Sequence, residues 1–437
     1  MSPPGPGYRV RAGGRVAGEL AVPGDKSISH RALLLGAIAR GSTRVRGFLA
    51  GEDCLATARA LESLGVRLEW PTPTEVIVHG VGPQGLVAPP GPLDLGNAGT
   101  AIRLLMGLLA PQRFGCTLRG DASLMRRPME RVAAPLRQMG ARIDTCDGRP
   151  PVVLHGGAPL RAIDYALPVA SAQVKSALLL AALGAEGITR LREPAPSRDH
   201  TERMLRAFGA EVEQQGATVS LRGGQSLRGT TLEVPGDFSS AAFFLVAGAL
   251  AAETPLILRN VGVNPTRTGL LEILRLMGAD IRVQRREAQG AEPSADLEVR
   301  RSTLRGIRVP EALVPLAIDE FPVLFIAAAA ADGETEVSGA AELRVKESDR
   351  LAAMAAGLGV LGVEHRLKPD GLWLRGQRTW RGGHIDSRGD HRIAMAFAVA
   401  ALRAREPLEI ADVANVATSF PGFEATARAA GLQIERH

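Results

Sequence analysis

The chain repeats one local pattern of apolar and polar positions six times. In each copy an apolar residue precedes a glycine, and an alternating polar–apolar segment follows it. The six glycines are Gly65, Gly140, Gly209, Gly278, Gly362 and Gly431. A glycine between a helical pattern and a strand pattern is typical of the position just after a helix end, where the backbone turns left-handed. The pattern therefore predicts six helices that end at these glycines and lead directly into strands.

A second feature lies upstream of each of these helices. A cluster of polar residues opens a long segment rich in Ala, Leu and other apolar residues. The six openings begin at Asp25, Asn97, Ser171, Asp237, Asp319 and Asp390. Asp, Asn and Ser cap helix N-termini, and segments such as Ala241–Ala252 are apolar nearly all round, so their helices must be buried. Each copy is expected to run as cap, buried helix, strand, outer helix, glycine and strand.

Six such copies predict an α/β fold of two similar domains with three copies each. The same tripeptide, Val-Pro-Gly, comes directly before the first and the fourth openings, at residues 22–24 and 234–236. This suggests that the chain crosses between the domains at both places. We therefore expect residues 23–236 to form the first domain and residues 1–22 with 237–437 to form the second. The first strand, Tyr8–Val22, would then belong to the second domain.

The predicted arrangement has an electrostatic consequence. If the buried helices of a domain run parallel, their N-termini converge on one face. Each helix N-terminus stabilises a nearby negative charge by roughly 0.3–1 kcal/mol. The openings also carry the cationic residues Lys26, Arg31, Lys175 and Arg392. Capping alone does not require this charge, so we expect these faces to bind anions.

Composition and charge narrow the classes of function. Hydrophobic residues make up 45% and charged residues 22%, as in an ordinary globular protein. The longest apolar runs are shorter than the roughly 18–20 residues of a membrane span, and Met1–Gly7 lacks the apolar core of a signal peptide. The net charge is +6, but the arginines are dispersed and aromatic residues make up only 4%. This favours a site for small anions over a nucleic-acid surface.

Cysteines and lysines are few. The three cysteines, Cys54, Cys116 and Cys146, are scattered without a CxxC pair. We therefore expect neither a disulfide framework nor a zinc site, which fits a reducing cytoplasm. Four of the 52 basic residues are lysines: Lys26, Lys175, Lys346 and Lys368. Arginine supplies the positive charge at nearly every other basic position. The few lysines therefore suggest positions that need a compact ammonium group.

Several segments together resemble the motifs of the 5-enolpyruvylshikimate-3-phosphate (EPSP) synthase family. They are Pro23–Arg31, Leu95–Arg103, Gly120–Met129, Arg344–Arg350, Asp390–Ala396 and Ser419–Pro421. The matches run in order along nearly the whole chain. The resemblance implies two domains of three βαβαββ repeats each, an inverted α/β barrel of the enolpyruvyl transferase type with the substrate cleft between the domains. This agrees with the repeat pattern.

The resemblance also implies a reaction. The family transfers the enolpyruvyl group of phosphoenolpyruvate to the 5-hydroxyl of shikimate 3-phosphate by addition and elimination, with release of phosphate, in aromatic amino acid biosynthesis. It needs no metal and no cofactor. The partners are then two small-molecule substrates, with no nucleic acid and no membrane, and the protein is expected to be a cytoplasmic monomer.

The family pattern assigns residues to three roles. The catalytic residues are Lys26, Asp319 and Glu347. Shikimate 3-phosphate would be bound by Lys26, Ser27, Arg31, Ser171, Ala172, Gln173, Ser197, Asp319 and Lys346. Phosphoenolpyruvate would be bound by Lys26, Gly99, Arg127, Gln173, Arg350 and Arg392. Arginine forks suit both anions because they bind carboxylate and phosphate bidentately.

Two carboxylates carry the chemistry in this assignment. Asp319 would orient and deprotonate the attacking hydroxyl, and Glu347 would act as acid and base at C3, in a role shared with Lys26. From the residues alone, Asp319 could instead be a helix cap and Glu347 a salt-bridged helix residue. Among neighbouring residues, we expect Arg126 to be a solvated charge and His30 and His391 to be structural. His200 is expected at most at the edge of the site.

The chain combines features of two branches of the family. Ala172–Lys175 and Ala417–Phe420 resemble the second branch, which includes glyphosate-tolerant members. Gly99, however, is the small residue typical of sensitive enzymes, so sensitivity to this inhibitor stays open, with sensitivity the expected outcome. The first branch has a lysine before the C-terminal Phe-Pro, where this chain has Thr418 and Ser419. One phosphate contact is therefore unassigned.

Two alternatives stay open. The enolpyruvyl transferase that acts on UDP-N-acetylglucosamine shares the fold and usually carries a cysteine on a mobile loop. Here Gly120–Met129 has no cysteine, and Cys116 lies in a predicted strand of the core. A non-catalytic or RNA-end-processing relative is the other alternative, since a fold does not determine a function. Two candidate acid/base carboxylates favour an enzyme.

Overall fold

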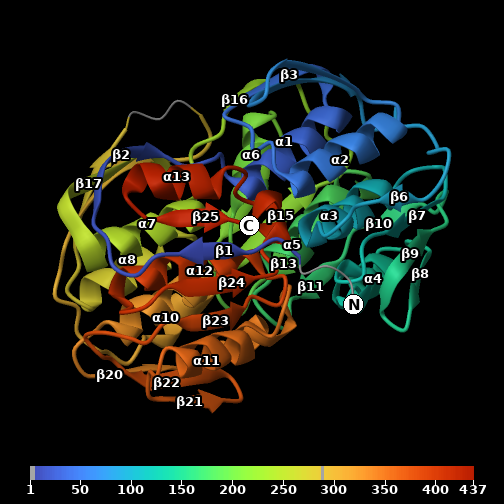
Figure 1. Cartoon of the computed structure of the whole chain (residues 1–437). Helices are drawn as coiled ribbons and strands as arrows, with labels where there is room; N and C mark the ends of the chain where they lie inside the picture. The colour runs from blue at the N-terminus through green and yellow to red at the C-terminus, as the bar shows by residue number, and fades with distance from the viewer. Residues whose placement is uncertain (1–4, 287–289) are drawn as a thin grey trace. The chain divides into compact units, whose positions relative to one another are not determined.

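The structure, a computed structural model, describes residues 5–286 and 290–437 (Figure 1). Contacts between residues divide the chain into two compact units. We call the first the N-terminal unit; it comprises Gly24–Val234 and the short segment that ends at Glu292. The second, the C-terminal unit, comprises the described residues 5–23 and 235–286, and Pro293–His437. Each unit has its own hydrophobic core.

The N-terminal unit contains three buried helices and three outer helices. The buried helices are α1 (Lys26–Ile38), α3 (Gly99–Leu109) and α5 (Ala172–Ala182). The outer helices are α2 (Glu52–Ser63), α4 (Glu130–Gln138) and α6 (His200–Ala207). The outer helices are amphipathic, with acidic residues in the first turn and apolar faces toward the core. The expected alternation of buried and outer helices is therefore confirmed.

The strands of the N-terminal unit form three four-stranded sheets and one short pair. The first sheet is β16 (Thr231–Glu233), β3 (Arg40–Arg46), β5 (Glu75–Val81) and β4 (Arg67–Thr72). The second is β6 (Leu93–Asp94), β7 (Cys116–Arg119), β9 (Arg149–Leu154) and β8 (Ile143–Cys146). The third is β11 (Asp164–Ala166), β13 (Ile188–Arg192), β15 (Thr218–Arg222) and β14 (Val212–Gln215). The short pair is β10 (Leu160–Arg161) with β12 (Ala185–Glu186).

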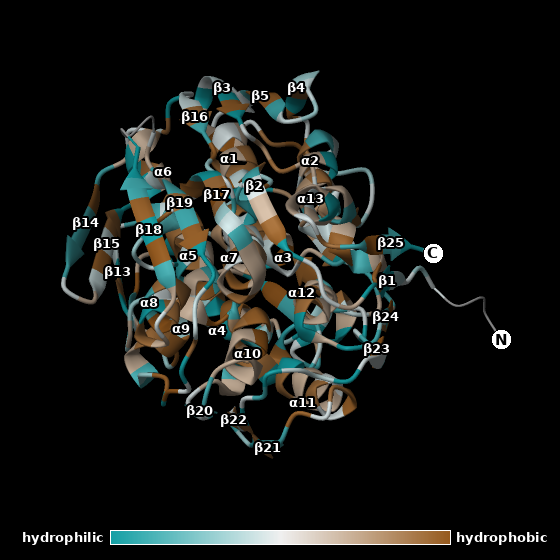
Figure 2. Ribbon diagram, turned by 60° about the vertical axis from the view of Figure 1, so that its left-hand side comes forward, coloured by the Kyte–Doolittle hydropathy of each residue, from teal (hydrophilic) through white to brown (hydrophobic). Residues whose placement is uncertain are grey.

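The C-terminal unit repeats this plan. Its helices are α7 (Phe238–Ala251), α8 (Gly269–Leu276), α9 (Val314–Ala317), α10 (Phe321–Ala329), α11 (Arg350–Val360), α12 (His391–Ala400) and α13 (Phe423–Ala430). Every residue of α7 and α10 is buried, and Figure 2 shows hydrophobic colours along both. The strand β18 alternates instead between the two colour ranges (Figure 2), as expected for a sheet with one face on the core.

The strands of the C-terminal unit form three sheets. The first is β18 (Asp280–Arg285), β19 (Ser294–Arg300), β17 (Ala252–Gly262) and β2 (Val16–Ala21). The second is β20 (Glu334–Val337), β22 (Gly371–Arg375) and β21 (His365–Lys368). The third is β23 (Gly383–Asp386), β24 (Leu408–Ala411), β1 (Tyr8–Val10) and β25 (Ile434–Arg436). Each four-stranded sheet of both units has one parallel edge pair and two antiparallel pairs, which is the pairing of a βαβαββ repeat.

Two edge strands are exchanged between the repeats. Strand β2 comes directly before α1 in the chain but pairs with β17 of the C-terminal unit. Strand β16 comes directly before α7 but pairs with β3 of the N-terminal unit. Both crossings lie at the Val-Pro-Gly tripeptides of residues 22–24 and 234–236.

Two details differ from the expectation. The predicted strand Tyr8–Val22 is two strands, β1 and β2, in different sheets, because Gly13 and Gly14 take positive φ values between them. Residues 290–292 were expected in the second domain, yet their contacts place them with the N-terminal unit. There the buried Glu292 carboxylate lies 2.7 Å from Nδ1 of the buried His200.

The six glycines of the repeat pattern all adopt left-handed conformations, with φ between 76° and 111°. In each, the N–H of the glycine and that of the next residue donate to carbonyls three and five residues earlier, as in Gly65 to Glu62 and Val66 to Leu61. This is the Schellman arrangement of a helix C-terminus. The predicted helix ends are therefore confirmed.

Four of the six openings cap their helices as predicted. The side chains of Asp25, Ser171, Asp237 and Asp390 accept a backbone N–H in the first turn. The prediction is wrong for Asn97 and Asp319, because α3 and α10 begin after Ala98 and Glu320, and no side chain accepts an N–H at either cap.

The N-terminal ends of the buried helices lie together in each unit. In the N-terminal unit, Nε2 of Gln173 in the first turn of α5 donates to Oγ1 of Thr100 in the first turn of α3. In the C-terminal unit, the Ser239 hydroxyl of α7 donates to Glu320 before α10, and Arg392 of α12 donates to the Asp319 carbonyl. The helices of each unit therefore direct their N-termini, and the partial positive charge of those ends, to one region.

A glycine brings α11 close to α12. A Cβ atom on Gly357 would lie 2.0 Å from Cζ of Phe397, which is fully buried. The two helices begin with Arg350 and, directly after Asp390, with His391. Their close approach therefore helps to hold Arg350 against Asp390.

We expect Gly357→Ala to destabilise the C-terminal unit by about 1–3 kcal/mol, because the new methyl group overlaps Phe397 and the helices must separate. The matched control is Gly359→Ala in the same helix. Its Cβ would meet only Cε1 of His365, at 3.5 Å, and alanine favours helix by up to about 1 kcal/mol. Urea unfolding of both variants is the measurement. Equal midpoints for the two variants would contradict this account of the packing.

Candidate active site

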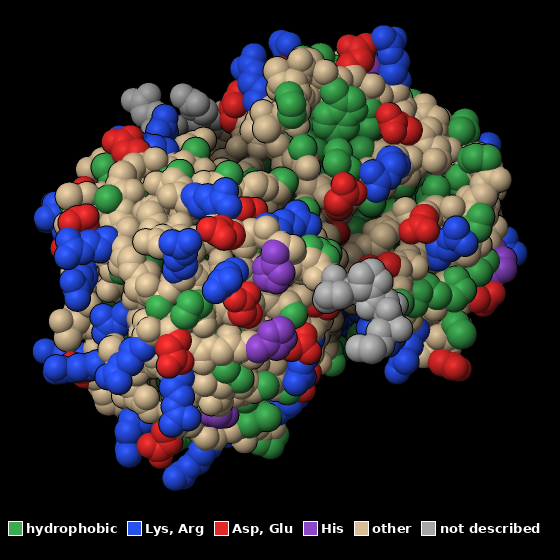
Figure 3. Space-filling model, viewed as in Figure 1, with side chains coloured by type: hydrophobic (Ala, Val, Ile, Leu, Met, Phe, Trp, Pro, Cys, Tyr) green, Lys and Arg blue, Asp and Glu red, His purple; other side chains and the backbone are tan. Residues whose placement is uncertain are grey.

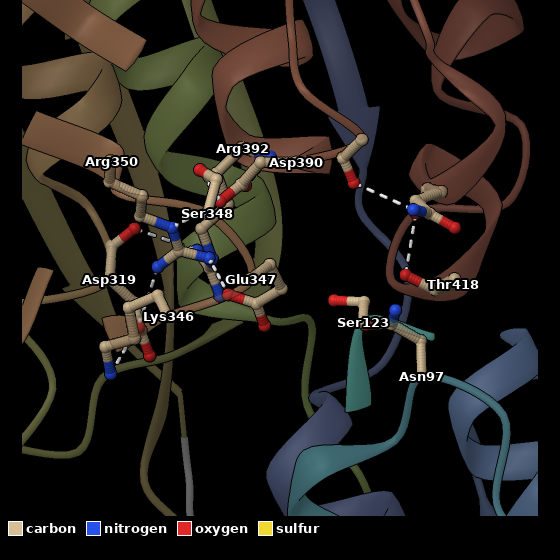
Figure 4. Close-up of polar contacts among 12 residues, drawn as sticks. Asn97, Ser123, Asp319, Lys346, Glu347, Ser348, Arg350, Asp390, Arg392 and Thr418 are labelled. Atoms are coloured by element: carbon tan, nitrogen blue, oxygen red, sulfur yellow. Dashed lines mark hydrogen bonds and ion pairs between the residues drawn. The ribbon is translucent and has the colours of Figure 1, made fainter. Parts of the chain in front are cut away.

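The guanidinium of Arg350 binds three carboxylates in the C-terminal unit. Its Nε donates to Asp390 at 2.9 Å, its Nη1 to Asp319 at 3.2 Å and its Nη2 to Glu347 at 2.5 Å. Figure 4 shows the planar group pointing between these residues. Arg350 is 1% exposed, so these bonds form away from water and hold the three carboxylates in fixed positions.

The charges around Arg350 set its protonation. Burial by itself would lower the pKa of Arg350, but the negative charges of Asp390, Glu347 and Asp319 more than offset this, so its pKa is raised above the ordinary value. The group is therefore a permanent cation at any physiological pH.

Two further cations complete this cluster. The Lys346 ammonium lies 3.4 Å from Oδ1 of Asp319. Nη1 of Arg392 donates to the Asp319 carbonyl at 3.1 Å, and the Ser348 hydroxyl donates to Asp390 at 3.1 Å (Figure 4). The structure thus brings together all five residues that the sequence assigned to this unit: Asp319, Lys346, Glu347, Arg350 and Arg392. Asp390 and Ser348 are additional members: the sequence analysis expected Asp390 only as a helix cap and placed Ser348 in a motif without a role.

In the N-terminal unit, Lys26 opens α1 and forms an ion pair with Asp53. Asp53 lies in the first turn of α2 and is buried. The pair fixes the ammonium group at the N-terminal end of α1. The sequence analysis missed Asp53, whose only signal was an acidic residue early in a helix.

Arg31 lies one turn further along α1. Its Nε donates to Thr201 at 2.7 Å, its Nη1 to the Ser27 carbonyl at 2.9 Å and its Nη2 to Ser176 at 2.7 Å. Burial lowers the pKa of Arg31 to about 10, against an opposing effect of the Glu202 charge. Arg31 is therefore still a cation at neutral pH.

Arg127 and Gly99 lie side by side at the start of α3. Nη2 of Arg127 donates to the Asn97 side chain and, at 3.4 Å, to the Ser123 hydroxyl. A Cβ atom on Gly99 would lie 2.7 Å from Nη1 of Arg127. A larger residue at position 99 would therefore displace this guanidinium. The expectation that Arg126 is a solvated charge is confirmed, because Arg126 is exposed and Arg127 is buried.

The amide of Gln173 has a fixed orientation. Nη1 of Arg103 donates to its Oε1 at 2.6 Å, and its Nε2 donates to Oγ1 of Thr100 at 3.0 Å. Arginine can only donate hydrogen bonds, so the oxygen must face Arg103. The Nε2 group of this amide has a second N–H, which can donate to an anion. Neither Arg103 nor Thr100 was singled out from the sequence.

Lys175 is buried between two glutamates. Its ammonium lies 2.7 Å from Glu193 and 2.7 Å from Glu202. Burial would lower the pKa of Lys175, but the charges and hydrogen bonds of both glutamates raise it. The Ser197 hydroxyl donates to Glu193. Ser197, which the sequence assigned to shikimate 3-phosphate, is therefore held by this cluster. The retained lysine therefore has a structural reason: a compact ammonium bridges two buried carboxylates.

The remaining assigned residues lie at the same helix openings. Ser27 and Ala172 are in the first turns of α1 and α5, and the Ser171 hydroxyl accepts from the N–H of Val174 at 3.5 Å. Thr418 and Ser419 stand where the first branch of the family has a lysine. Thr418 donates to the carbonyl of Asn415, whose amide donates to the Gly389 carbonyl (Figure 4).

Several expectations about single residues are settled. His30 is fully buried against Thr57, and burial lowers its pKa well below the usual value, so it is structural. His200 is buried and lies 2.7 Å from the Glu292 carboxylate. Cys116 lies in strand β7 of the core, and burial raises the pKa of its thiol to about 11, so it is not a reactive thiolate.

Within residues 5–286 and 290–437, no group of three or more His, Cys, Asp or Glu side chains could hold a metal ion. Among the same residues, none of the helices combines the length and the apolar character needed to cross a membrane.

The fold defines a class of protein. The structure superimposes on the enolpyruvyl transferase NikO from Streptomyces tendae with a TM-score of 0.80, covering 100% of this chain and 99% of that one, at 18% identity. At this identity the likeness concerns the fold alone. The chain has the two-domain enolpyruvyl transferase fold.

The particular family follows from closer matches. The family model of EPSP synthase (3-phosphoshikimate 1-carboxyvinyltransferase) matches residues 10–426. A 3-phosphoshikimate 1-carboxyvinyltransferase of Alkalilimnicola ehrlichii is 60% identical over 430 residues, which is 98% of this chain and 96% of the relative. The solved EPSP synthase of Acinetobacter baumannii is 52% identical, with a TM-score of 0.88 and coverage of 99% and 100%. The chain belongs to the EPSP synthase family and is a transferase of the shikimate pathway.

We expect Lys175→Met to destabilise the N-terminal unit by about 3–5 kcal/mol, because it leaves two buried carboxylates without their cation. Lys368→Met is the matched control. Lys368 pairs with Glu336 in strand β20, and both side chains are about one third exposed, at 35% and 31%. Loss of such a pair costs about 0–1 kcal/mol. Urea unfolding compares the two variants, and a Lys175→Met midpoint equal to that of Lys368→Met would contradict the structural role.

Proposed function

We propose that this chain transfers the enolpyruvyl group of phosphoenolpyruvate to the 5-hydroxyl of shikimate 3-phosphate and releases phosphate. The observation that carries the proposal is the cluster on Arg350. There, Asp319 and Glu347, the two candidate acid/base carboxylates, bind to one buried guanidinium. The names of the relatives, 3-phosphoshikimate 1-carboxyvinyltransferases, support the same reaction.

The chemistry requires two proton-transfer sites. In the addition step, the acceptor hydroxyl loses its proton and its oxygen bonds to C2 of phosphoenolpyruvate, while C3 takes up a proton. In the elimination step, the tetrahedral adduct loses a proton from C3 and the C–O bond to phosphate breaks, which restores the double bond. One group must act at the hydroxyl and another at C3, and each such group typically contributes a factor of about 10²–10⁴ in rate.

Asp319 is the proposed base for the hydroxyl. Its carboxylate is held by Arg350 and lies 3.4 Å from Lys346. It does not cap α10, although it stands at the opening of that helix. The Asp319 side chain therefore contacts the charged cluster and does not stabilise the helix end, which supports a functional role.

Glu347 is the proposed acid and base at C3, in a role shared with Lys26. The Glu347 side chain is 23% exposed while its partner Arg350 is 1% exposed. The Glu347 carboxylate thus accepts from a buried cation, while part of the side chain is exposed. Lys26 carries an ammonium held by Asp53 at the start of α1.

The cationic side chains suit the two anionic substrates. We assign phosphoenolpyruvate to Lys26, Gly99, Arg127, Gln173, Arg350 and Arg392, and shikimate 3-phosphate to Lys26, Ser27, Arg31, Ser171, Ala172, Gln173, Ser197, Asp319 and Lys346. The fixed donor orientation of Gln173 and the anion-attracting helix N-termini support this assignment. Each charge-assisted bond is worth roughly 1.5–3 kcal/mol.

Other properties stay predictions. On the face drawn in Figure 3, Lys and Arg side chains are interspersed with Asp and Glu, which supports small anions over nucleic acid as partners. A cytoplasmic location, a monomeric state and sensitivity to glyphosate are the further expectations.

The first test is phosphate release by the purified chain with phosphoenolpyruvate, in the presence of EDTA. We expect release with shikimate 3-phosphate as acceptor and none with UDP-N-acetylglucosamine. Because the proposed chemistry uses only protein side chains, EDTA should not reduce the rate. Release with the nucleotide sugar alone, or with neither acceptor from a folded sample, would overturn the proposal.

The second test is substitution of the two carboxylates. Asp319→Asn and Glu347→Gln keep the size of the side chain and remove the base, so we expect kcat to fall by about 10²–10⁴-fold in each. Glu342→Gln is the control, because Glu342 precedes the same motif and has no assigned role. Turnover at the wild-type rate in either folded carboxylate variant would refute its assignment.

A further inference from the structure

Two hydroxyl groups occupy one edge of the Arg31 guanidinium. Nε of Arg31 donates to Oγ1 of Thr201, and Nη2 donates to Oγ of Ser176, both at 2.7 Å. The Thr201 hydroxyl in turn donates to Ser176 at 2.6 Å. The two oxygens therefore stand side by side and bind the guanidinium edge in the way that the two oxygens of a carboxylate would.

These contacts limit how Arg31 can bind a ligand. A guanidinium has five N–H groups. Among the described residues, Thr201, Ser176 and the Ser27 carbonyl engage three of them. The two that remain are one on Nη1 and one on Nη2. The Nε edge is closed, and only the terminal nitrogens can take a further anion.

The hydroxyl pair is itself held by the fold. Ser176 and Thr201 are fully buried, on α5 and α6. Their neighbours Lys175 and Glu202 form an ion pair at 2.7 Å between the same two helices. Two consecutive residues of α5 thus contact two consecutive residues of α6, and this fixes the position of both hydroxyls relative to Arg31.

We propose that Ser176 and Thr201 are positioning residues, which close the Nε edge of Arg31 so that the ring carboxylate of shikimate 3-phosphate is bound through the terminal N–H pair. This inference rests on the proposed function, in which Arg31 binds that carboxylate. Without the hydroxyl pair, the N–H groups on Nε and Nη2 of Arg31 form a second pair of donors, and the guanidinium can rotate. A carboxylate could then bind to either pair of N–H groups.

The test uses Thr201→Val and Ser176→Ala, each of which removes one acceptor with little change of shape. We expect the KM for shikimate 3-phosphate to rise about tenfold in each, with kcat and the KM for phosphoenolpyruvate within about threefold of wild type. Thr201→Ser keeps the hydroxyl and should restore the wild-type KM. Thr189→Val is the matched control, because the buried Thr189 hydroxyl makes no hydrogen bond among the described residues.

A second readout separates positioning from general loss of structure. Wild type should bind shikimate 3-phosphate more tightly than its analogue with a carboxamide in place of the ring carboxylate. We expect this preference to shrink about tenfold in Thr201→Val and Ser176→Ala. In an Arg31→Met background, Thr201→Val should add no further rise in KM, because the hydroxyl acts through Arg31.

The outcomes distinguish this inference from the proposed function. If wild type does not prefer the carboxylate, or if Arg31→Met leaves the KM unchanged, the role of Arg31 in the proposed function is wrong and this inference falls with it. If wild type prefers the carboxylate and Arg31→Met raises the KM, but Thr201→Val and Ser176→Ala bind the substrate like wild type, the positioning role alone is wrong. If Thr201→Val does not fold, Ser176→Ala decides the question, because alanine is favourable in a helix.

Discussion

The burial of one largely apolar helix in each repeat constrains the rest of this protein. Such a helix carries most of its polar side chains in its first two turns and just before it, as Arg31 of α1 and Ser176 of α5 show. The observed hydrogen bonds join these openings to one another, Gln173 with Thr100 in one unit and Arg392 with Asp319 in the other. The candidate site residues therefore gather at helix N-termini, where backbone N–H groups already favour anions.

Local stability and chemistry compete at these openings. Four openings cap their helices, whereas Asn97 and Asp319 bind the guanidinium groups of Arg127 and Arg350 instead. A missing side-chain cap typically costs about 0.5–2 kcal/mol. At Asp390 the two roles coincide, because its carboxylate caps α12 and also accepts from Arg350. Among the six openings, only Asn97 and Asp319 give up the cap for a guanidinium.

The sequence predicted the features that depend on short-range chemistry. The periodic glycines predicted the helix ends, and the apolar segments predicted the buried helices, because both follow from local backbone and burial preferences. The family resemblance supplied the charged residues, and Arg350 and four others form one cluster. The repeat pattern placed the first strand in the second domain, but the partners that lie far along the chain could not be predicted. The strands that pair with β2 and β16, the pairing of Glu292 with His200 and the orientation of Gln173 by Arg103 all depend on tertiary contacts.

The third sheet of the C-terminal unit has a consequence for the order of the repeats. In the other repeats the last two strands are successive along the chain, as in β4 and β5. In this sheet the corresponding strands are β25 and β1, from opposite ends of the chain, and Gly7 and His437 exchange backbone hydrogen bonds of 3.0 and 3.1 Å (Figure 1). The six repeats thus follow one another in a cyclic order. A circularly permuted chain, joined here by a short linker and opened at another hairpin, would keep every strand pairing of the fold.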